Sequence, residues 1–142
     1  MEIDRELVER RLAEIKGAIE ELKEIGNLGL KEFLSNPYIR YAAKYLLITA
    51  IEGTFSICNH IAVRKGSIPS SYSDCFLKLA GFGVISRDLA ERLAQMAKFR
   101  NMLVHLYWRI DDEKVFEIIQ KDISDLKEFI RAVVEYLDKG GN

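Results

Sequence analysis

Hydrophobic residues recur every three or four positions over most of the chain, which is the pattern of amphipathic helices and not of strands. The first such stretch predicts a helix from about Asp4 to Ile25, with Asp4 as its N-cap and Gly26 as its end. Residues 27–35 are expected to form a linker or a short helical turn. The apolar positions of the first helix are Val8, Leu12, Ile15, Ile19 and Leu22.

A second predicted helix starts at Asn36-Pro37, because asparagine is a good N-cap and proline is well tolerated at the first helical position. It is expected to run to about Lys65, where Gly66 stops it. Its middle is apolar on most sides, so we expect this helix to lie at the centre of the fold. A loop should follow up to about residue 72.

Two further helices are predicted before residue 111. A short one covers residues 73–80, and the sequence Gly81-Phe-Gly ends it. The next one is capped by Ser86, and its apolar pattern extends to about Trp108 or Ile110.

The last helical region starts at Asp111-Asp112 and ends at Gly140-Gly141, with a break expected near residues 120–122. No strand-like alternation and no internal repeat interrupts this succession of helices. We therefore predict one all-α domain over residues 1–142, built as a four- to five-helix up-down bundle.

The predicted helix that begins at Ser86 has hydrophobic residues on two faces. One stripe, which can anchor the helix in its own core, contains Met96, Phe99, Leu103, Leu106 and Ile110. A second stripe, about 120–160° away on an ideal helix, contains Leu93, Ala97, Val104 and Trp108. Burial at the centre of one chain would explain both stripes. Contact with a second subunit is favoured, because polar side chains flank the second stripe and are costly to bury without a function.

Charge is concentrated on this same segment, although the whole chain has a net charge of only −1. Residues 86–110 carry five basic side chains and two acidic ones, so a phosphate is expected to bind here if it binds anywhere. The basic residues are Arg87, Arg92, Lys98, Arg100 and Arg109, and the acidic ones are Asp88 and Glu91.

Composition argues against several other classes of protein. The chain lacks an uninterrupted apolar run of about 18 residues, and its charged first residues do not resemble a secretory signal, so we expect a cytoplasmic protein. Cys58 and Cys75 are expected to be buried as small hydrophobic residues and not joined in a disulfide. With only His60 and His105 available, we expect neither a metal site nor a cofactor.

Arg100, Asn101 and His105 are the residues with the most suggestive chemistry. A guanidinium binds phosphate with a fixed fork of donors, and histidine exchanges protons near neutral pH. RNA supplies its own nucleophile, the 2′-hydroxyl, so its cleavage needs a base, an acid and stabilisation of the phosphate. One chain has a single histidine in this segment, and a two-fold dimer would provide a second one. The Arg-x4-His spacing by itself is a weak signal.

The wider sequence resembles the HepT family of HEPN proteins over roughly residues 45–120. The motif Arg100-Asn-Met-Leu-Val-His105-Leu-Tyr107 is similar to the Arg-Asn-x-x-Val-His-x-Tyr form of the HEPN Arg-x4-6-His motif. Three further segments resemble the HepT pattern in the same order: Ile57-Cys-Asn-His60-Ile, residues 69–76 and Gly83-Val-Ile-Ser86.

This resemblance implies an all-α HEPN fold, a symmetric homodimer and a metal-independent endoribonuclease toxin that cuts RNA, with tRNA and mRNA as candidates. It implies as partner a minimal nucleotidyltransferase of the MntA type, the antitoxin, which can attach AMP to Tyr107. Arg100 would bind the scissile phosphate, His105 would act as acid or base, and Asn101 would orient the phosphate or His105. The alternative is a non-catalytic HEPN module that binds and regulates a nucleotidyltransferase or a nucleotide.

Three other residues are weaker candidates. Glu52 is equally well explained as a partner that holds Arg100 and as an ordinary half-exposed glutamate. For His60 a hydrogen-bonded structural role is favoured over a supporting role in the site, and Tyr72 is expected to pack over helix ends. On an ideal helix Arg100 and His105 point about 140° apart. A cleft across the dimer or a distorted helix end must therefore bring them together.

Overall fold

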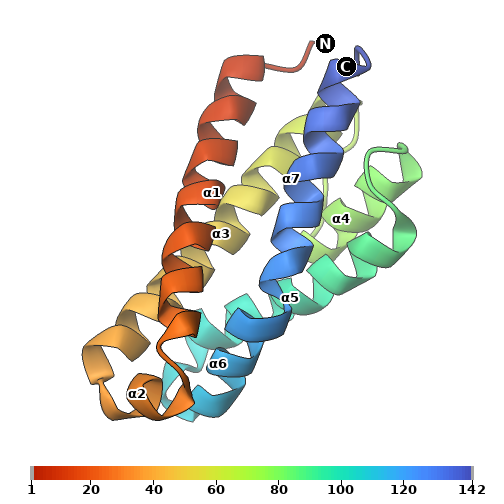
Figure 1. Ribbon diagram of the computed structural model, residues 1–142. Coiled ribbons are helices and arrows are strands. Elements are labelled where there is room, and N and C mark those ends of the chain that lie inside the picture. Colours follow the sequence, from red (N-terminus) through yellow and green to blue (C-terminus); the bar gives the residue numbers. More distant parts are fainter. Residues whose placement is uncertain (1, 142) are drawn as a thin grey trace.

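A computed structural model describes residues 2–141 as seven α-helices and one 3-10 turn, without a β-strand in that range (Figure 1). The predicted all-α class is therefore confirmed, while the outermost residues of the expected domain, Met1 and Asn142, lie outside the described range. The elements are α1 (Arg5–Asn27), α2 (Leu30–Ser35), α3 (Pro37–Arg64), α4 (Tyr72–Gly81), α5 (Arg87–His105), η1 (Tyr107–Arg109), α6 (Asp112–Lys121) and α7 (Ile123–Asp138).

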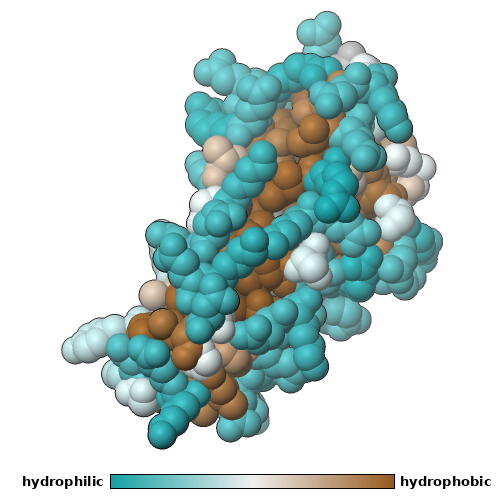
Figure 2. All heavy atoms as spheres, in the orientation of Figure 1, coloured by the Kyte–Doolittle hydropathy of each residue, from teal (hydrophilic) through white to brown (hydrophobic). Residues whose placement is uncertain are grey.

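Four long helices, α1, α3, α5 and α7, form the predicted up-down bundle. Each contacts the next around the ring, and α3 contacts every other α-helix, as expected for the central element. The start of α1 and the end of α7 lie at the same end of the bundle (Figure 1), where Arg5 Nη2 donates to the carbonyl of Leu137 at 2.8 Å. Figure 2 shows hydrophobic side chains gathered in a band between α1 and α7, with hydrophilic side chains on both sides.

The helix starts follow the predicted caps. The side chain of Asp4 accepts from the backbone N–H of Leu7, and that of Ser86 accepts from Leu89, both at 3.1 Å. Asn36 accepts from the first N–H groups of α3, which begins at Pro37 as expected. A short polar side chain before each apolar stretch satisfies backbone donors that have no partner within the helix.

Gly26 was predicted to end α1, and this is wrong: the helix continues to Asn27, and the left-handed turn (φ +88°) falls at Gly29. Gly26 has a different function in packing. A Cβ atom at this position would lie 3.3 Å from the side chain of Gln120 on α6, whose amide donates to the carbonyl of Gly26 at 2.8 Å. The missing side chain lets α6 approach the backbone of α1.

The helix count is higher than predicted for two reasons: an expected linker is helical, and the final helical region is divided in two. Residues 30–35, expected to be a linker or a short turn, form α2, and the final helical region breaks at Asp122 between α6 and α7. The break lies where the sequence indicated it, near residues 120–122. Short helices at one end of the bundle thus supplement the four long ones (Figure 1).

The end of α5 also differs from the prediction. The helix stops at His105, not at Trp108 or Ile110, because the backbone of Leu106 (φ −129°, ψ 37°) leaves the helical region. A 3-10 turn follows, in which the N–H of Arg109 donates to the carbonyl of Leu106 at 2.8 Å. This turn leaves the side chains of Tyr107 and Trp108 67% and 66% exposed.

The two apolar stripes of α5 have different fates. In the first stripe Met96, Phe99 and Leu103 are buried, as predicted. In the second stripe Leu93 and Ala97 are buried within this chain, so the prediction that they face a second subunit is wrong. Helix α5 packs against α3, α4 and α7. Of the second stripe, only Val104 and Trp108 are not fully buried within this chain.

By length and composition α3 resembles a membrane-spanning helix, and it is the one helix in residues 2–141 that does. More than half of its most apolar window, 56%, is buried within the bundle. This is the pattern of a core helix, so α3 is weak evidence for a membrane span.

Candidate functional site

The guanidinium of Arg100 lies near the end of α5 and faces α3. Its Nη2 donates to the Glu52 carboxylate, and its Nη1 donates to Asn101 Oδ1 at 3.1 Å. The side chain of Arg100 is only 16% exposed. The pairing of Glu52 with Arg100, one of the two equal alternatives from the sequence, is therefore present, and it joins α3 to α5.

Aromatic rings complete the surroundings of Arg100. The guanidinium carbon lies 5.3 Å from the centre of the Tyr72 ring, at the start of α4. Tyr72 in turn stacks on Phe55 of α3, with ring centres 3.9 Å apart and planes 6° apart. Side chains from α3, α4 and α5 thus surround the cation, and Tyr72, the first residue of α4, packs over Arg100 near the end of α5.

One donor of Arg100 stays unused in this arrangement. Its Nε is buried and has no hydrogen-bond partner among the described residues. A buried donor without an acceptor costs about 1–3 kcal/mol. The Nε atom itself has almost no exposed surface, so a bound anion would contact the 16% of the Arg100 side chain that stays exposed.

His105 is not brought to Arg100 within one chain. It is the last residue of α5, its side chain is exposed, and no hydrogen bond or ion pair joins it to another described residue. The helix stays regular up to His105, so a distorted helix end does not bring the two side chains together. That a cleft between two chains combines them stays a prediction from the sequence.

His60 lies elsewhere and has a structural role. Its Nε2 accepts from the backbone N–H of Asp4 at 2.9 Å, which ties α3 to the start of α1. The side chain is buried, and burial lowers the pKa of His60, with Arg64 adding to the effect and Asp4 opposing it. The structure therefore separates His60 from the surroundings of Arg100, as the favoured structural interpretation predicted.

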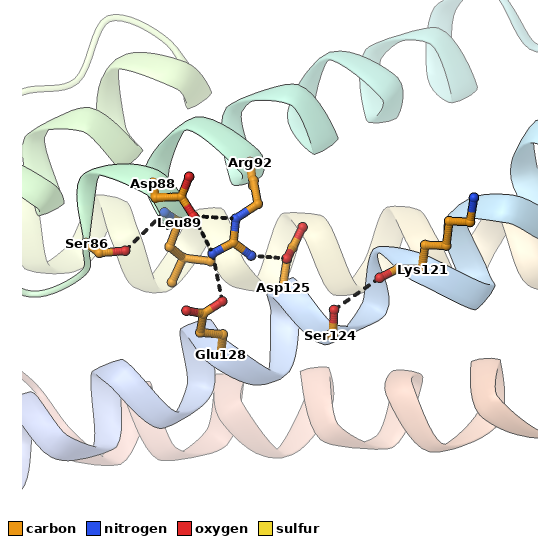
Figure 3. A network of polar contacts seen from close by, with 8 residues as sticks. All are labelled: Ser86, Asp88, Leu89, Arg92, Lys121, Ser124, Asp125 and Glu128. Atoms are coloured by element: carbon orange, nitrogen blue, oxygen red, sulfur yellow. Dashed lines mark hydrogen bonds and ion pairs between the residues drawn. The ribbon is translucent and has the colours of Figure 1, made fainter.

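Arg92 has a neighbourhood that the sequence did not reveal (Figure 3). Its guanidinium donates to Asp88 at 3.1 Å, to Glu128 at 2.9 Å and to Asp125, so three carboxylates surround one cation. Burial lowers the pKa of Arg92, but the hydrogen bonds to Glu128 and Asp125 outweigh it and raise this pKa above its usual value. Only Asp88, four residues before Arg92, was visible as a partner in the sequence.

This network corrects the expectation of a basic segment. Arg92 is neutralised by three acids, and Arg87 pairs with Glu91 at 3.4 Å. No ion pair involves Lys98 or Arg109 among the described residues. Within residues 86–110, a phosphate would therefore meet unneutralised cations only along the second half of α5 and in η1.

The cysteines are buried and unpaired, as predicted. Burial raises the pKa of the Cys58 thiol, and a hydrogen bond with Cys75 adds to this effect, so neither packing nor protonation favours a reactive thiolate. Across residues 2–141 no three His, Cys, Asp or Glu side chains are grouped as metal ligands.

A row of exposed tyrosines was missed in the sequence. Tyr38, Tyr41 and Tyr45 follow one another at helical spacing along α3, and all three are exposed. We call this surface the tyrosine face. The same side of α3 continues by helical spacing to Glu52, so the face leads to the partner of Arg100. The spacing of three and four residues was a signal that could have identified it.

The cations next to the tyrosine face are already paired. Arg40 and Lys44 contact the carboxylate of Asp112 at 3.3 Å and 2.8 Å, at the start of α6. These ion pairs also connect the first half of α3 to the chain just after η1. The tyrosine face therefore presents aromatic rings, and the two cations beside it, Arg40 and Lys44, are both engaged by Asp112.

Comparison with known proteins adds a family. The sequence matches the family described as "Ribonuclease HepT-like" over residues 15–133. It is 28% identical over 137 residues to a tRNA nuclease HepT of Aphanizomenon flos-aquae, with 95% of this chain and 92% of the relative covered. It is 32% identical over 132 residues to a putative RNase of Archaeoglobus fulgidus, with coverage of 92% and 96%.

The fold is shared with a solved toxin structure. A tri-AMPylated HEPN toxin of Shewanella oneidensis, solved in complex with MNT antitoxin, superimposes with a TM-score of 0.85. The two sequences are 25% identical, and the match covers 91% of this chain and 97% of that one.

Proposed function

The chain belongs to the HepT-like ribonuclease family, and on this premise we propose that it is an endoribonuclease toxin with a site built on Arg100 and His105. The observation that carries this proposal is the state of Arg100. Glu52, Asn101 and Tyr72 hold the guanidinium in place, while its buried Nε lacks an acceptor. A phosphate oxygen is the acceptor that such a fixed cation fits.

The cleavage step follows from these residue types. One His105 takes the proton of the RNA 2′-hydroxyl, and the 2′-oxygen then attacks the neighbouring phosphorus. A second, protonated His105 gives its proton to the 5′-oxygen as the bond from phosphorus to that oxygen breaks. Arg100 stabilises the negative charge on the phosphate oxygens, and Asn101 orients Arg100. The products are a 2′,3′-cyclic phosphate and a 5′-hydroxyl, and the nucleophile belongs to the RNA, so this scheme requires no metal.

This scheme needs two histidines, and a homodimer supplies them. We assign the tyrosine face to the contact between two copies of the chain. Aromatic residues are enriched in protein interfaces and charged ones are depleted, and the neighbouring Arg40 and Lys44 are occupied by Asp112. Because the face leads to Glu52, a two-fold contact there places the two Arg100 sites on adjoining surfaces.

Regulation by a nucleotidyltransferase antitoxin of the MntA type is part of the same proposal. Tyr107 lies two residues after His105, and its side chain is exposed. AMP attached to its hydroxyl would place phosphate groups beside the site and exclude RNA by charge and bulk. The related toxin that was solved with MNT antitoxin is described as AMPylated, which supports this role for Tyr107. Toxin, partner and RNA would all be cytoplasmic.

A second candidate function rests on the same contacts. Glu52 already neutralises Arg100, and His105 has no partner within the chain. A non-catalytic module that binds and regulates a nucleotidyltransferase or a nucleotide would also have these features. Cleavage by the purified chain separates the two functions.

The test uses purified full-length chain and a pool of tRNA, with and without a metal chelator. The proposal predicts cleavage in both conditions, a dimer in solution, and loss of cleavage in Arg100→Ala and His105→Ala. Arg87→Ala is the matched control, because Arg87 lies on the surface of the same helix and pairs with Glu91. A dimeric wild type that leaves all RNA intact but binds its nucleotidyltransferase would favour the regulatory function. Unchanged cleavage by both site variants would exclude the proposed site.

A further inference from the structure

Trp108 is the only tryptophan of the chain, and it is exposed although tryptophan is usually among the most buried residues. It lies in η1, three residues after His105. The hydrogen bond from Arg109 to Leu106 fixes the turn that carries it. An exposed indole on a fixed turn beside a proposed RNA-cleaving histidine suggests a contact that the free chain does not make.

The ring of Trp108 packs edge-to-face against the ring of Tyr107. Its centre lies 5.3 Å from that of the Tyr107 ring, and the planes are perpendicular, with an angle of 86°. Such edge-to-face contacts stabilise aromatic pairs. Because both residues are about two-thirds exposed, the pair forms an aromatic surface that a flat group can approach.

We propose that Trp108 stacks on a nucleobase of single-stranded RNA next to the phosphate that is cleaved. This inference rests on the proposed ribonuclease function and names a binding residue for its substrate. In-line attack requires the 2′-oxygen, the phosphorus and the 5′-oxygen to line up, which separates the two flanking bases. Stacking on an indole offsets the loss of base–base stacking and tolerates any base, since every base has a flat face.

The side chains around Trp108 suit RNA better than a protein partner. Arg109 is exposed, forms no ion pair among the described residues, and directly follows Trp108. His105, three residues before Trp108, is also exposed. Arginine is also enriched in protein interfaces, so the choice of RNA rests on the proposed cleaving histidine three residues before Trp108. A cation next to an aromatic ring is typical of single-strand binding sites. The tyrosine face has the opposite composition, which is why we assign it to a second copy.

The single tryptophan makes the contact directly measurable. The probe is a short 2′-O-methyl oligoadenylate, which keeps the bases and the phosphates but has no free 2′-hydroxyl to attack. Titrated into the wild-type chain, it should quench the fluorescence of Trp108 because the base covers the ring. An abasic oligomer with the same backbone should bind more weakly and should leave the emission unchanged.

Variants test whether stacking contributes to affinity and cleavage. Trp108→Ala is expected to weaken binding of a labelled oligoadenylate by about tenfold and to slow cleavage of tRNA. Trp108→Phe, which keeps a flat ring, should retain most of both. Ile68→Ala is the matched control, because Ile68 is an exposed hydrophobic residue far along the chain in the loop before α4. Thermal unfolding should change little in all three variants, since each replaced side chain is mostly exposed.

The outcomes separate this inference from the proposed function. Cleavage of tRNA by wild type without quenching, and with normal binding by Trp108→Ala, would overturn the stacking role and leave the ribonuclease intact. Tryptophan emission that shifts with protein concentration in the absence of RNA would place Trp108 in a subunit contact, which also overturns it. A chain that neither cleaves nor binds RNA would overturn both. Quenching together with the loss of affinity supports it.

Discussion

Two arginines on α5, Arg92 and Arg100, lie eight residues apart and have opposite surroundings. Arg92 contacts three carboxylates and links α5 to α7 (Figure 3). Arg100 contacts one carboxylate, Glu52, and an aromatic ring, and its buried Nε has no partner. Both side chains are guanidinium cations on the same helix.

The difference between them is the number of acceptors that the fold supplies. Arg92 is surrounded by more negative charge than it carries, so it repels a further anion and serves as a clasp between helices. Arg100 is positioned but incompletely satisfied, which is what a binding group requires. Counting charges along the sequence does not distinguish Arg92 from Arg100. The number of hydrogen-bond acceptors around each guanidinium in the folded chain does distinguish them.

The largest effect is expected from Arg100→Ala, which should lower the rate of RNA cleavage by about 100-fold or more, because it removes the group that stabilises charge on the phosphate. Arg92→Ala should cleave at nearly the wild-type rate at a temperature where it is folded. Initial rates on one tRNA substrate, measured for both variants, check this. Equal losses in the two variants would erase the contrast between the two halves of α5.

The next largest effect is on stability, and here the Arg92 network and not the Arg100 site is expected to matter. Arg92→Ala removes the cation that pairs with the mostly buried carboxylate of Asp125. Because Arg92 itself is partly exposed, the free energy of unfolding should fall by only about 2 kcal/mol. Asp88→Asn removes only an exposed partner and should cost under about 0.5 kcal/mol. Urea unfolding followed by circular dichroism measures both. If Arg92→Ala were as stable as Asp88→Asn, Arg92 would not stabilise the contact between α5 and α7.

A smaller effect is expected from the partner of Arg100. Glu52→Ala should lower the cleavage rate by about tenfold, because the guanidinium loses the acceptor that positions it. Glu52→Gln keeps an oxygen acceptor in place and should retain most of the rate. The expected loss is in kcat with little change in KM, since Glu52 acts through Arg100. A Glu52→Ala variant with faster cleavage would instead identify Glu52 as an inhibitor of the cation.

The smallest effect extends the contrast to the two histidines, of which His60 is bonded inside the fold and His105 is exposed. Burial lowers the pKa of folded His60, so the unfolded chain takes up its proton more readily. The stability contributed by neutral His60 is therefore complete above its ordinary pKa of about 6.5 and is lost as the pH falls below it.

In the variant His60→Gln an amide oxygen can accept the Asp4 N–H and does not titrate. Between pH 7 and pH 5, roughly the range in which histidine changes charge, the free energy of unfolding should fall more in wild type than in this variant. Urea unfolding at each pH measures the difference. Parallel pH profiles would show that His60 does not titrate on unfolding.

Local signals in the sequence predicted most of the fold. Asp4, Asn36 and Ser86 were identified as caps because capping depends on residues that are neighbours in sequence. Gly26 was misassigned because a glycine that ends a helix and one that admits a neighbouring helix have the same sequence signature. Only the position of Gln120, 94 residues further along, distinguishes them.

The site was predicted in part for the same reason. The pair of Glu52 and Arg100 was proposed as one of two equal alternatives, and the structure decides between them. The acids around Arg92 were missed because Asp125 and Glu128 lie on another helix. Leu93 was expected at an interface, since periodicity reveals that a face is buried but not which chain buries it.

The unpartnered Nε of Arg100 has a consequence for attempts to make the protein hardier. Apolar side chains of similar size in place of both Arg100 and its partner Glu52 would pack against Tyr72 without leaving a donor or a carboxylate unpaired, and such replacements of whole ion pairs are often neutral or favourable. Selection for heat resistance alone would therefore tend to discard this arginine. The most heat-stable variants of the chain would then be ones that no longer cleave RNA.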